Sequence, residues 1–169
     1  MSQRDLFFKW LFYSLLGLFW LSLQQLLLNR VSLWGGLHPF ILPMVPAMAA
    51  IFERRQEASF YAMGAGLLCD LLLPDSFPGL YTLAFLLSSL LAGVIAARVI
   101  VRGFLCACVC SIVALVLSSL FHALFLSSST SFTFATALSL TGRELFLSLP
   151  AFPLLFLSFR KVYRRIRNE

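Results

Sequence analysis

The sequence predicts an all-α integral membrane protein with six transmembrane helices. Of its 169 residues, 60% are hydrophobic and only 12% are charged, and the mean hydropathy is +0.92. Soluble domains have about 45–50% apolar and about 25% charged residues, so this chain lacks the polar surface of a water-soluble globule. Six spans of about 20 residues each leave no room for a separate soluble domain. We therefore expect residues 1–169 to form a single polytopic membrane domain.

The first three expected spans are apolar runs at residues 10–28, 37–52 and 58–73. The first run is too long for a signal-peptide core and precedes no small-x-small cleavage site, so we expect it to be retained. The second run contains three prolines, which membrane helices tolerate where neighbours satisfy the freed carbonyls. The third run contains Asp70 and ends in a turn rich in proline, with one glycine.

The last three expected spans are residues 80–97, 104–126 and 145–159. The first two are continuous apolar runs, whereas the last has 15 residues and two prolines. A helix of that length is about 22 Å long, which is short of the roughly 30 Å hydrocarbon core. The last span therefore either thins the bilayer locally or begins within residues 132–140. That stretch could instead lie along the outer interface.

The distribution of basic residues predicts that both chain ends are cytoplasmic. With six spans and a cytoplasmic N-terminus, 11 of the 13 Lys and Arg residues lie on the inner side. A five-span arrangement gives no such bias, so the positive-inside rule favours six spans. Aromatic residues agree, because Trp10 falls at an inner end and Tyr81 at an outer end, where amphipathic rings prefer to lie.

Asp70 is the first candidate functional residue, because a carboxylate within a membrane span is costly and needs a partner. Ala58, Ala62 and Gly66 precede it at four-residue spacing and form one band of small side chains, against which another helix can pack closely. We expect Asp70 to contact either His122 or the backbone N–H groups near Leu80. Its role is then a structural hydrogen bond that fixes helix register, a proton or substrate relay, or simple exposure at a helix end.

Two further helices carry the same kind of band. The fourth expected span has Ser89 and Gly93 at four-residue spacing, and the fifth leads to His122 by the same spacing. Because the third and fifth spans both run outward, His122 is expected at a depth similar to that of Asp70. These bands predict specific contacts between helices rather than a purely lipid-organising protein.

Two other polar groups stand out. The amides of Gln24, Gln25 and Asn29 at the outer end of the first span are expected to bond across helices or to cap a helix end, or else to bind a partner's transmembrane helix. The segment around Glu53 and Glu57 is expected to be a solvated loop with local charge pairing. The C-terminal basic cluster predicts binding to anionic lipids, with a cytoplasmic protein partner as the alternative; it comprises Arg160, Lys161, Arg164, Arg165 and Arg167.

The sequence predicts no enzyme activity, cofactor or metal site. It contains no His-Glu-x-x-His, Gly-x-Ser-x-Gly or P-loop motif. Cys106-x-Cys108-x-Cys110 lacks zinc-site spacing and has no nearby histidine or carboxylate ligands. The net charge of +6 is split into short clusters between apolar runs, which indicates topology rather than nucleic-acid binding.

Residues 64–93 resemble the signature of the rod shape-determining protein MreD family. The family shows a Gly-x-Gly-Leu-x-x-Asp-Leu-like helix, a short Gly-Leu turn and an apolar helix that ends in Ala-Gly. The positions of this chain that match are Gly66, Asp70, Gly79, Leu80, Tyr81 and Gly93. Gly36-Leu-His-Pro39 also resembles the proline-containing start of the family's second helix, although the acidic residue that usually follows is Phe40 here.

The resemblance implies a non-enzymatic scaffold in the cytoplasmic (inner) membrane of a bacterium, within the machinery for cell elongation and peptidoglycan synthesis. Its implied partners are MreC, a single-span protein with an extracytoplasmic coiled coil, and through it MreB, RodA and a class B penicillin-binding protein. The residues expected at helix interfaces or at the partner are Ala62, Gly66, Asp70, Gly79, Tyr81, Ser89, Gly93 and His122.

The family's fold is also similar to the S component of energy-coupling-factor vitamin transporters, which supplies the alternative function. A small-molecule binding subunit needs convergent polar groups in a cavity that opens outward. Gln24, Gln25, Asp70 and His122 are the residues that could form one.

Overall fold

The computed structural model describes residues 3–28, 38–72, 79–98, 103–129, 139, 142–143 and 146–167, and within these ranges all regular secondary structure is helical. This confirms the predicted all-α class. The helices are α1 (Gln3–Leu23), which continues into the π-helical turn η1 (Gln24–Leu28), α2 (Met44–Phe52), α3 (Arg55–Leu72), α4 (Leu80–Arg98), α5 (Phe104–Ser129), and α7 (Phe152–Arg167), which follows the 3-10 turn η2 (Leu149–Ala151).

Three helical segments of the described chain are long and apolar enough to cross a membrane. They are Leu80–Arg98, Phe104–Leu124 and Phe146–Arg165. Large apolar side chains also cover the outer surfaces of the helices; the exposed fraction is 73% for Phe60, 74% for Leu105 and 83% for Leu71. A water-soluble monomer rarely exposes so much contiguous apolar surface, so these faces are suited to lipid.

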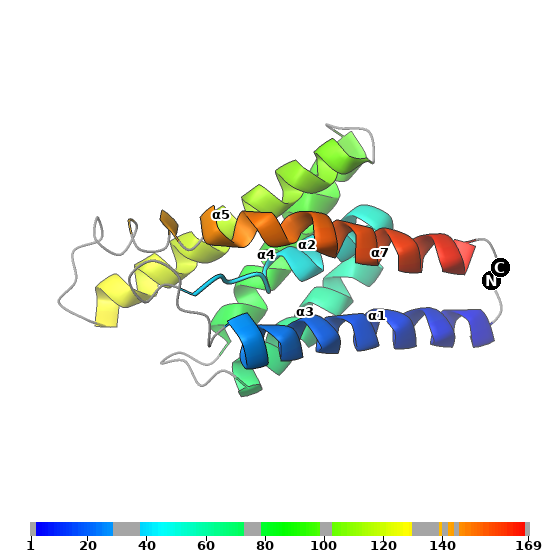
Figure 1. The fold of residues 1–169 in the computed structure, drawn as a ribbon, viewed down its shortest axis with the longest axis horizontal. Helices are drawn as coiled ribbons and strands as arrows, with labels where there is room; N and C mark the ends of the chain where they lie inside the picture. Colours follow the sequence, from blue (N-terminus) through cyan, green and yellow to red (C-terminus); the bar gives the residue numbers. More distant parts are fainter. Residues whose placement is uncertain are drawn as a thin grey trace.

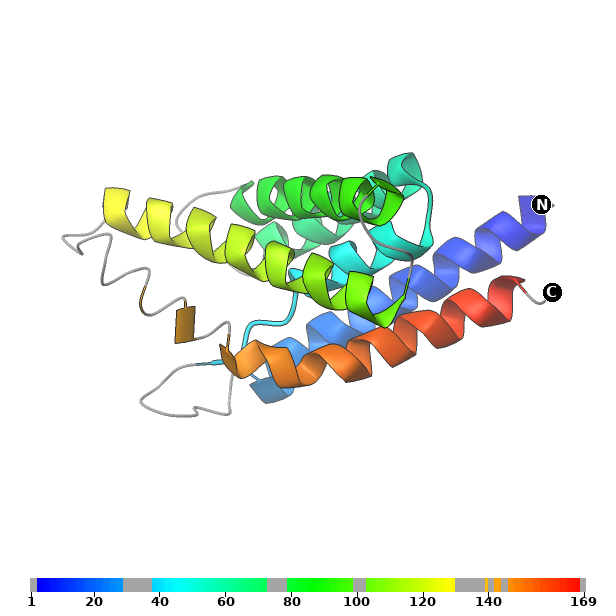
Figure 2. The same ribbon diagram turned by 90° about the horizontal axis from the view of Figure 1, so that it is seen from above.

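Successive helices run in alternating directions, so that both chain ends lie at the same end of the molecule (Figure 1). We call this the terminal end and the other the opposite end. Helices α1 and α7 pack against each other and project beyond the other helices at the terminal end (Figure 2). Helix α3 packs most extensively against α4, and α4 also packs against α5.

Helix α2 is the centre of the fold. It contacts α3, α4, α5 and α7, and every residue from Ile41 to Ile51 is buried. Its side chains include three alanines and two methionines, which let the four surrounding helices approach from several directions.

The second expected span is helical only in its second half, which corrects the predicted helix over 37–52. The helix begins at Met44, and residues 38–41 before it are not helical. Proline has no backbone N–H and disfavours the helical conformation of the residue before it, so Pro39 and Pro43 oppose a helix here.

Two side chains satisfy the backbone of this non-helical segment. The amide of Gln24 donates to the carbonyl oxygen of Pro39 over 2.7 Å and accepts the N–H of Ile41 over 3.1 Å. The hydroxyl of Ser148 accepts the N–H of Phe40 over 2.8 Å. Irregular backbone at membrane depth is tolerated only where protein groups replace the missing hydrogen bonds. Gln24 therefore bonds across elements of its own chain, as one of the two sequence interpretations expected.

The last expected span also has different bounds. Its helix does not end near residue 159 but continues to Arg167, so Arg160, Lys161, Arg164 and Arg165 lie on α7 and are exposed. The question of whether residues 132–140 lie along the interface falls almost entirely outside the described residues.

We predict that Gln24→Leu lowers the free energy of unfolding by about 1–3 kcal/mol, because it leaves the Pro39 carbonyl and the Ile41 N–H buried without partners. Unfolding by SDS in mixed micelles provides the measurement, and Ser22→Ala on the exposed face of α1 is the control. Equal stability of the two variants would contradict this role for Gln24.

Candidate functional site

Helices α3 and α4 approach most closely at Gly66. The buried face of α3 consists of Ala58, Ala62, Gly66 and Cys69. A Cβ atom on Gly66 would lie only 2.9 Å from the backbone nitrogen of Thr82 and 3.1 Å from the carbonyl oxygen of Tyr81. Both of these are backbone atoms that cannot rotate away, so the contact requires glycine. The predicted band of small residues is thus occupied by a helix of the same chain.

Asp70 caps the first turn of α4 from the neighbouring helix. Its Oδ1 accepts the N–H of Tyr81 over 3.0 Å, and its Oδ2 accepts the N–H of Thr82 over 3.1 Å and the hydroxyl of Thr82 over 2.5 Å. The first N–H groups of a helix have no partner within it and carry partial positive charge, so a carboxylate there is stabilising.

This contact decides between the two partners expected for Asp70. The backbone N–H groups that open α4 bind the carboxylate, as predicted. His122 lies partly buried on α5, and within the described residues no hydrogen bond or ion pair joins it to Asp70.

Gly79 and Tyr81 complete the same unit. Gly79 has a φ of 93°, which an L side chain rarely adopts, and its carbonyl oxygen accepts the N–H of Leu83 in the first turn of α4. Tyr81 is buried and its ring lies 5.8 Å from that of Phe40 and 6.1 Å from that of Phe85. Tyr81 therefore lies at the end of α4, as expected, but its ring packs into the core.

Ser89 and Gly93 lie further along α4 and are both buried. A Cβ on Gly93 would meet the Arg55 side chain at 3.6 Å, an ordinary contact distance, so this glycine is not required by the packing. The predicted interface residues therefore form one connected unit at Ala62, Gly66, Asp70, Gly79 and Tyr81. Ser89, Gly93 and His122 lie outside it.

A buried charge cluster at the terminal end was not predicted. Lys9 on α1 forms ion pairs with Glu53 and, over 2.7 Å, with Glu57. Only 7% of the Lys9 side chain and 9% of the Glu53 side chain are exposed. The expected solvated loop with local pairing is therefore wrong: both carboxylates turn towards α1. Because the partners are more than 40 residues apart, sequence spacing gave no signal for this contact.

Aromatic side chains extend this connection between α1 and α3. The hydroxyl of Tyr61 donates to the carbonyl oxygen of Tyr13 over 3.1 Å, and the ring of Trp10 lies 6.3 Å from that of Tyr61. Gly17 makes room for the Tyr61 hydroxyl, since a Cβ on Gly17 would lie 2.5 Å from it.

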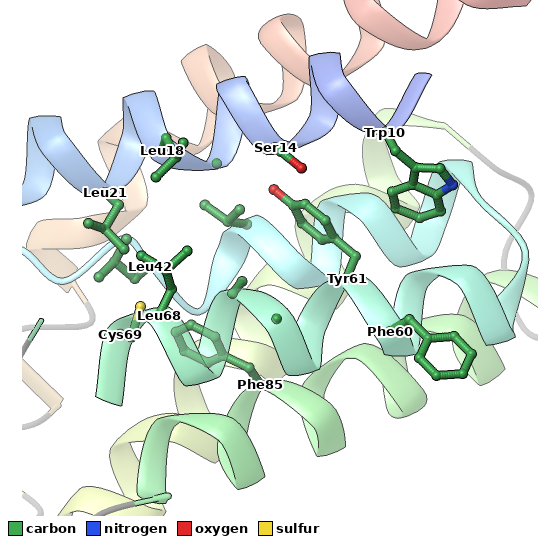
Figure 3. A pocket seen from close by; sticks show the side chains of 14 residues that line it. Trp10, Ser14, Leu18, Leu21, Leu42, Phe60, Tyr61, Leu68, Cys69 and Phe85 are labelled. Atoms are coloured by element: carbon green, nitrogen blue, oxygen red, sulfur yellow. The ribbon is translucent and has the colours of Figure 1, made fainter. Parts of the chain in front are cut away.

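Beyond these contacts α1 and α3 enclose a cavity of about 370 Å³. Figure 3 shows it between α1 and α3, with α2 behind and Tyr61 pointing from α3 towards α1. None of the described residues that line it is charged; they are Trp10, Ser14, Gly17, Leu18, Leu21, Leu42, Val45, Phe60, Tyr61, Gly64, Ala65, Leu68, Cys69 and Phe85. The cavity is partly open to the surface of the helices. We call this cavity the α1–α3 groove.

The structure does not gather the polar residues that a small-molecule site would need. Gln24 is bonded to the Pro39–Ile41 backbone and Asp70 to the start of α4. In the described ranges, no three His, Cys, Asp or Glu residues are placed to hold a metal ion. Cys106 and Cys110 lie 4.0 Å apart between their sulfur atoms, one helical turn apart on the buried face of α5.

Comparison with protein-family models, curated proteins and solved structures finds no match for the chain.

We predict that Gly66→Ala lowers the free energy of unfolding by about 1–3 kcal/mol, because its methyl group would force α3 and α4 apart. Gly64→Ala, two residues away on the same helix, should be neutral or stabilising by up to about 1 kcal/mol, because nothing lies within 4 Å of the added Cβ. SDS unfolding of the two variants tests this, and equal effects would contradict the proposed contact.

We also predict that Lys9→Met destabilises the protein by about 3 kcal/mol, because it leaves two carboxylates without their cation in a largely buried site. Adding Glu53→Gln and Glu57→Gln to this variant should restore most of the lost stability. If the triple variant is no more stable than Lys9→Met alone, the cluster is not held together by its charges.

Proposed function

We propose that this chain is a non-enzymatic scaffold of the bacterial cell-elongation machinery in the cytoplasmic membrane. It would bind the single-span protein MreC and, through that complex, act with MreB, RodA and a class B penicillin-binding protein. The observation that supports the proposal is that most of the residues behind the MreD resemblance, all but Gly93, form one physical unit. Gly66, Asp70, Gly79 and Tyr81 meet at the α3–α4 junction, where each has a distinct structural role.

The arrangement of the chain ends supports six crossings with both ends in the cytoplasm. Gln3 and Arg167 lie at the same end of the molecule (Figure 1), as an even number of crossings requires. Arg160, Lys161, Arg164 and Arg165 are exposed on α7 at that end. The positive-inside rule places such residues in the cytoplasm, where they would bind anionic lipid headgroups.

The packing changes how the small-residue bands serve a scaffold. Ala62 and Gly66 are buried against α4, so a partner helix does not contact them directly. We propose instead that this unit holds α3 and α4 rigidly and that the partner meets the outer apolar faces of the helices. Helix association in lipid depends on close packing and a few hydrogen bonds, so a rigid surface favours it.

The vitamin-binding alternative has less support. A pocket for a polar small molecule combines an apolar wall with a few convergent polar groups. The described lining of the α1–α3 groove has no charged side chain, and the Tyr61 hydroxyl in it is already bonded to the Tyr13 carbonyl.

Crosslinked pull-down of the tagged chain from native bacterial membranes tests the proposal. We expect a single-span partner with an extracytoplasmic coiled coil to be recovered in stoichiometric amount. Gly66→Leu should reduce its recovery because α3 and α4 no longer fit together, whereas Gly142→Leu, a Gly-to-Leu change at a described position away from these helices with nothing within 4 Å of an added Cβ, should retain it.

Two results would contradict the scaffold. One is recovery of the chain alone, with both variants behaving as wild type. The other is a large thermal shift that is specific for one vitamin, which would establish the binding-subunit alternative.

A further inference from the structure

We propose that the α1–α3 groove binds one acyl chain of a membrane phospholipid, from the leaflet that faces the terminal end. This inference is independent of the scaffold proposal and depends on the shape, polarity and position of the groove. The groove opens between two helices whose outer faces are apolar, with Phe60, Leu67 and Leu18 all exposed. In a bilayer, the opening of the groove therefore faces the hydrocarbon chains of the lipids.

An empty α1–α3 groove would be energetically unfavourable. An empty apolar cavity forfeits the dispersion contacts of the atoms that line it. Water does not compensate, because a water molecule needs two to four polar partners and an apolar cavity stays dry. The described lining is nearly all hydrocarbon, and its Tyr61 hydroxyl is engaged by Tyr13. An apolar occupant therefore gains contacts that neither water nor a polar ligand can provide.

The dimensions of the groove favour an acyl chain over a helix. Along α1 the lining runs from Trp10 to Leu21, which is about 16 Å at 1.5 Å per residue. Spread over that length, a cavity volume of about 370 Å³ corresponds to a groove roughly 8 Å wide between atom surfaces, once the radius of a water molecule is added on each side. A helix with its side chains is about 10–12 Å wide. A single file of methylene groups, with carbon contacts at about 3.5–4.0 Å, fits the slot.

Small residues make room for the α1–α3 groove. Gly17 on α1 and Gly64 and Ala65 on α3 line it, and they provide room that larger side chains would fill. A glycine within a helix costs up to about 1 kcal/mol relative to alanine. Among the described residues, no atom beyond the neighbouring residues and the backbone of its own helix lies within 4 Å of a Cβ built on Gly64, so packing against the described helices does not account for its small size.

The ends of the groove set the direction of the lipid. Trp10 and Phe60 lie at its end nearest the terminal end, and tryptophan prefers the level of the lipid headgroups (Figure 3). Arg54 is exposed just before α3, six residues from Phe60. Lys9, Arg54 and Arg55 outnumber Glu53 and Glu57 in this region, so it carries a net charge of +1, which suits an anionic headgroup.

Photocrosslinking in vesicles tests the inference. The full chain is reconstituted in phosphatidylethanolamine and phosphatidylglycerol, doped with a phosphatidylglycerol that carries a diazirine in one acyl chain. After irradiation, labelled residues are mapped by mass spectrometry. We expect residues 17–21 and 64–68 to be labelled several-fold more than the exposed stripe of α5 that contains Ile112 and Val116.

Two substitutions test whether the labelling depends on the shape of the groove. Gly64→Leu fills the slot and should reduce groove labelling several-fold without changing labelling of α5. Leu67→Trp adds bulk on the same helix but outside the groove lining, and should leave the pattern unchanged. Retained folding of both variants is checked by SDS unfolding.

Three results would overturn the proposal. The first is equal labelling of the groove and the α5 stripe. The second is groove labelling that Gly64→Leu does not reduce. The third is loss of groove labelling in native membranes together with a protein crosslink at the groove, which would assign it to a partner helix or to a second copy of the chain.

Discussion

The structure depends on one contact, in which the Asp70 carboxylate binds the first turn of α4 while Gly66 lets the two backbones meet. An ionised side chain within a membrane span is costly unless it is paired. Here the cost is offset because α4 has unpaired N–H groups at Tyr81 and Thr82, which need acceptors as much as Asp70 needs donors. Without the close approach at Gly66, the carboxylate would not reach them. The polar group and the small residue therefore form a single device that fixes the register of α3 and α4.

The same principle, that a polar group in an apolar medium must find a partner, explains the other irregular features. Residues 38–41 cannot supply their own helical hydrogen bonds, so Gln24 and Ser148, distant in sequence, supply them. At the terminal end Lys9 joins α1 to two carboxylates on either side of the α2–α3 turn. These contacts connect elements that lie far apart in the chain, and together they place the buried helix α2 among its neighbours.

Local signals in the sequence predicted the parts of the fold that are determined locally. Helices α3, α4 and α5 begin and end within a few residues of the expected spans, because each is a continuous apolar run that ends at charged or turn-forming residues. Asp70 and the small residues that precede it at four-residue spacing were also predicted, because their spacing is a local feature of the sequence. Of the two partners expected for Asp70, the start of α4 is the one observed. The Lys9 cluster and the role of Ser148 depend on residues 44 and 108 positions away from their partners. The non-helical start of the second span was not predicted, because its three prolines were expected to kink a helix. Instead the helix begins only after the first two of them.

A double-mutant cycle on Asp70 and Thr82 tests the central claim most directly. Asp70→Asn, Thr82→Val and the combined variant are compared with wild type by SDS unfolding in mixed micelles. If the carboxylate and the hydroxyl stabilise the α3–α4 junction together, the two substitutions should be non-additive, with a coupling energy of about 1–2 kcal/mol. If their effects add to within about 0.5 kcal/mol, the two groups act independently and Asp70 does not hold α4 in place.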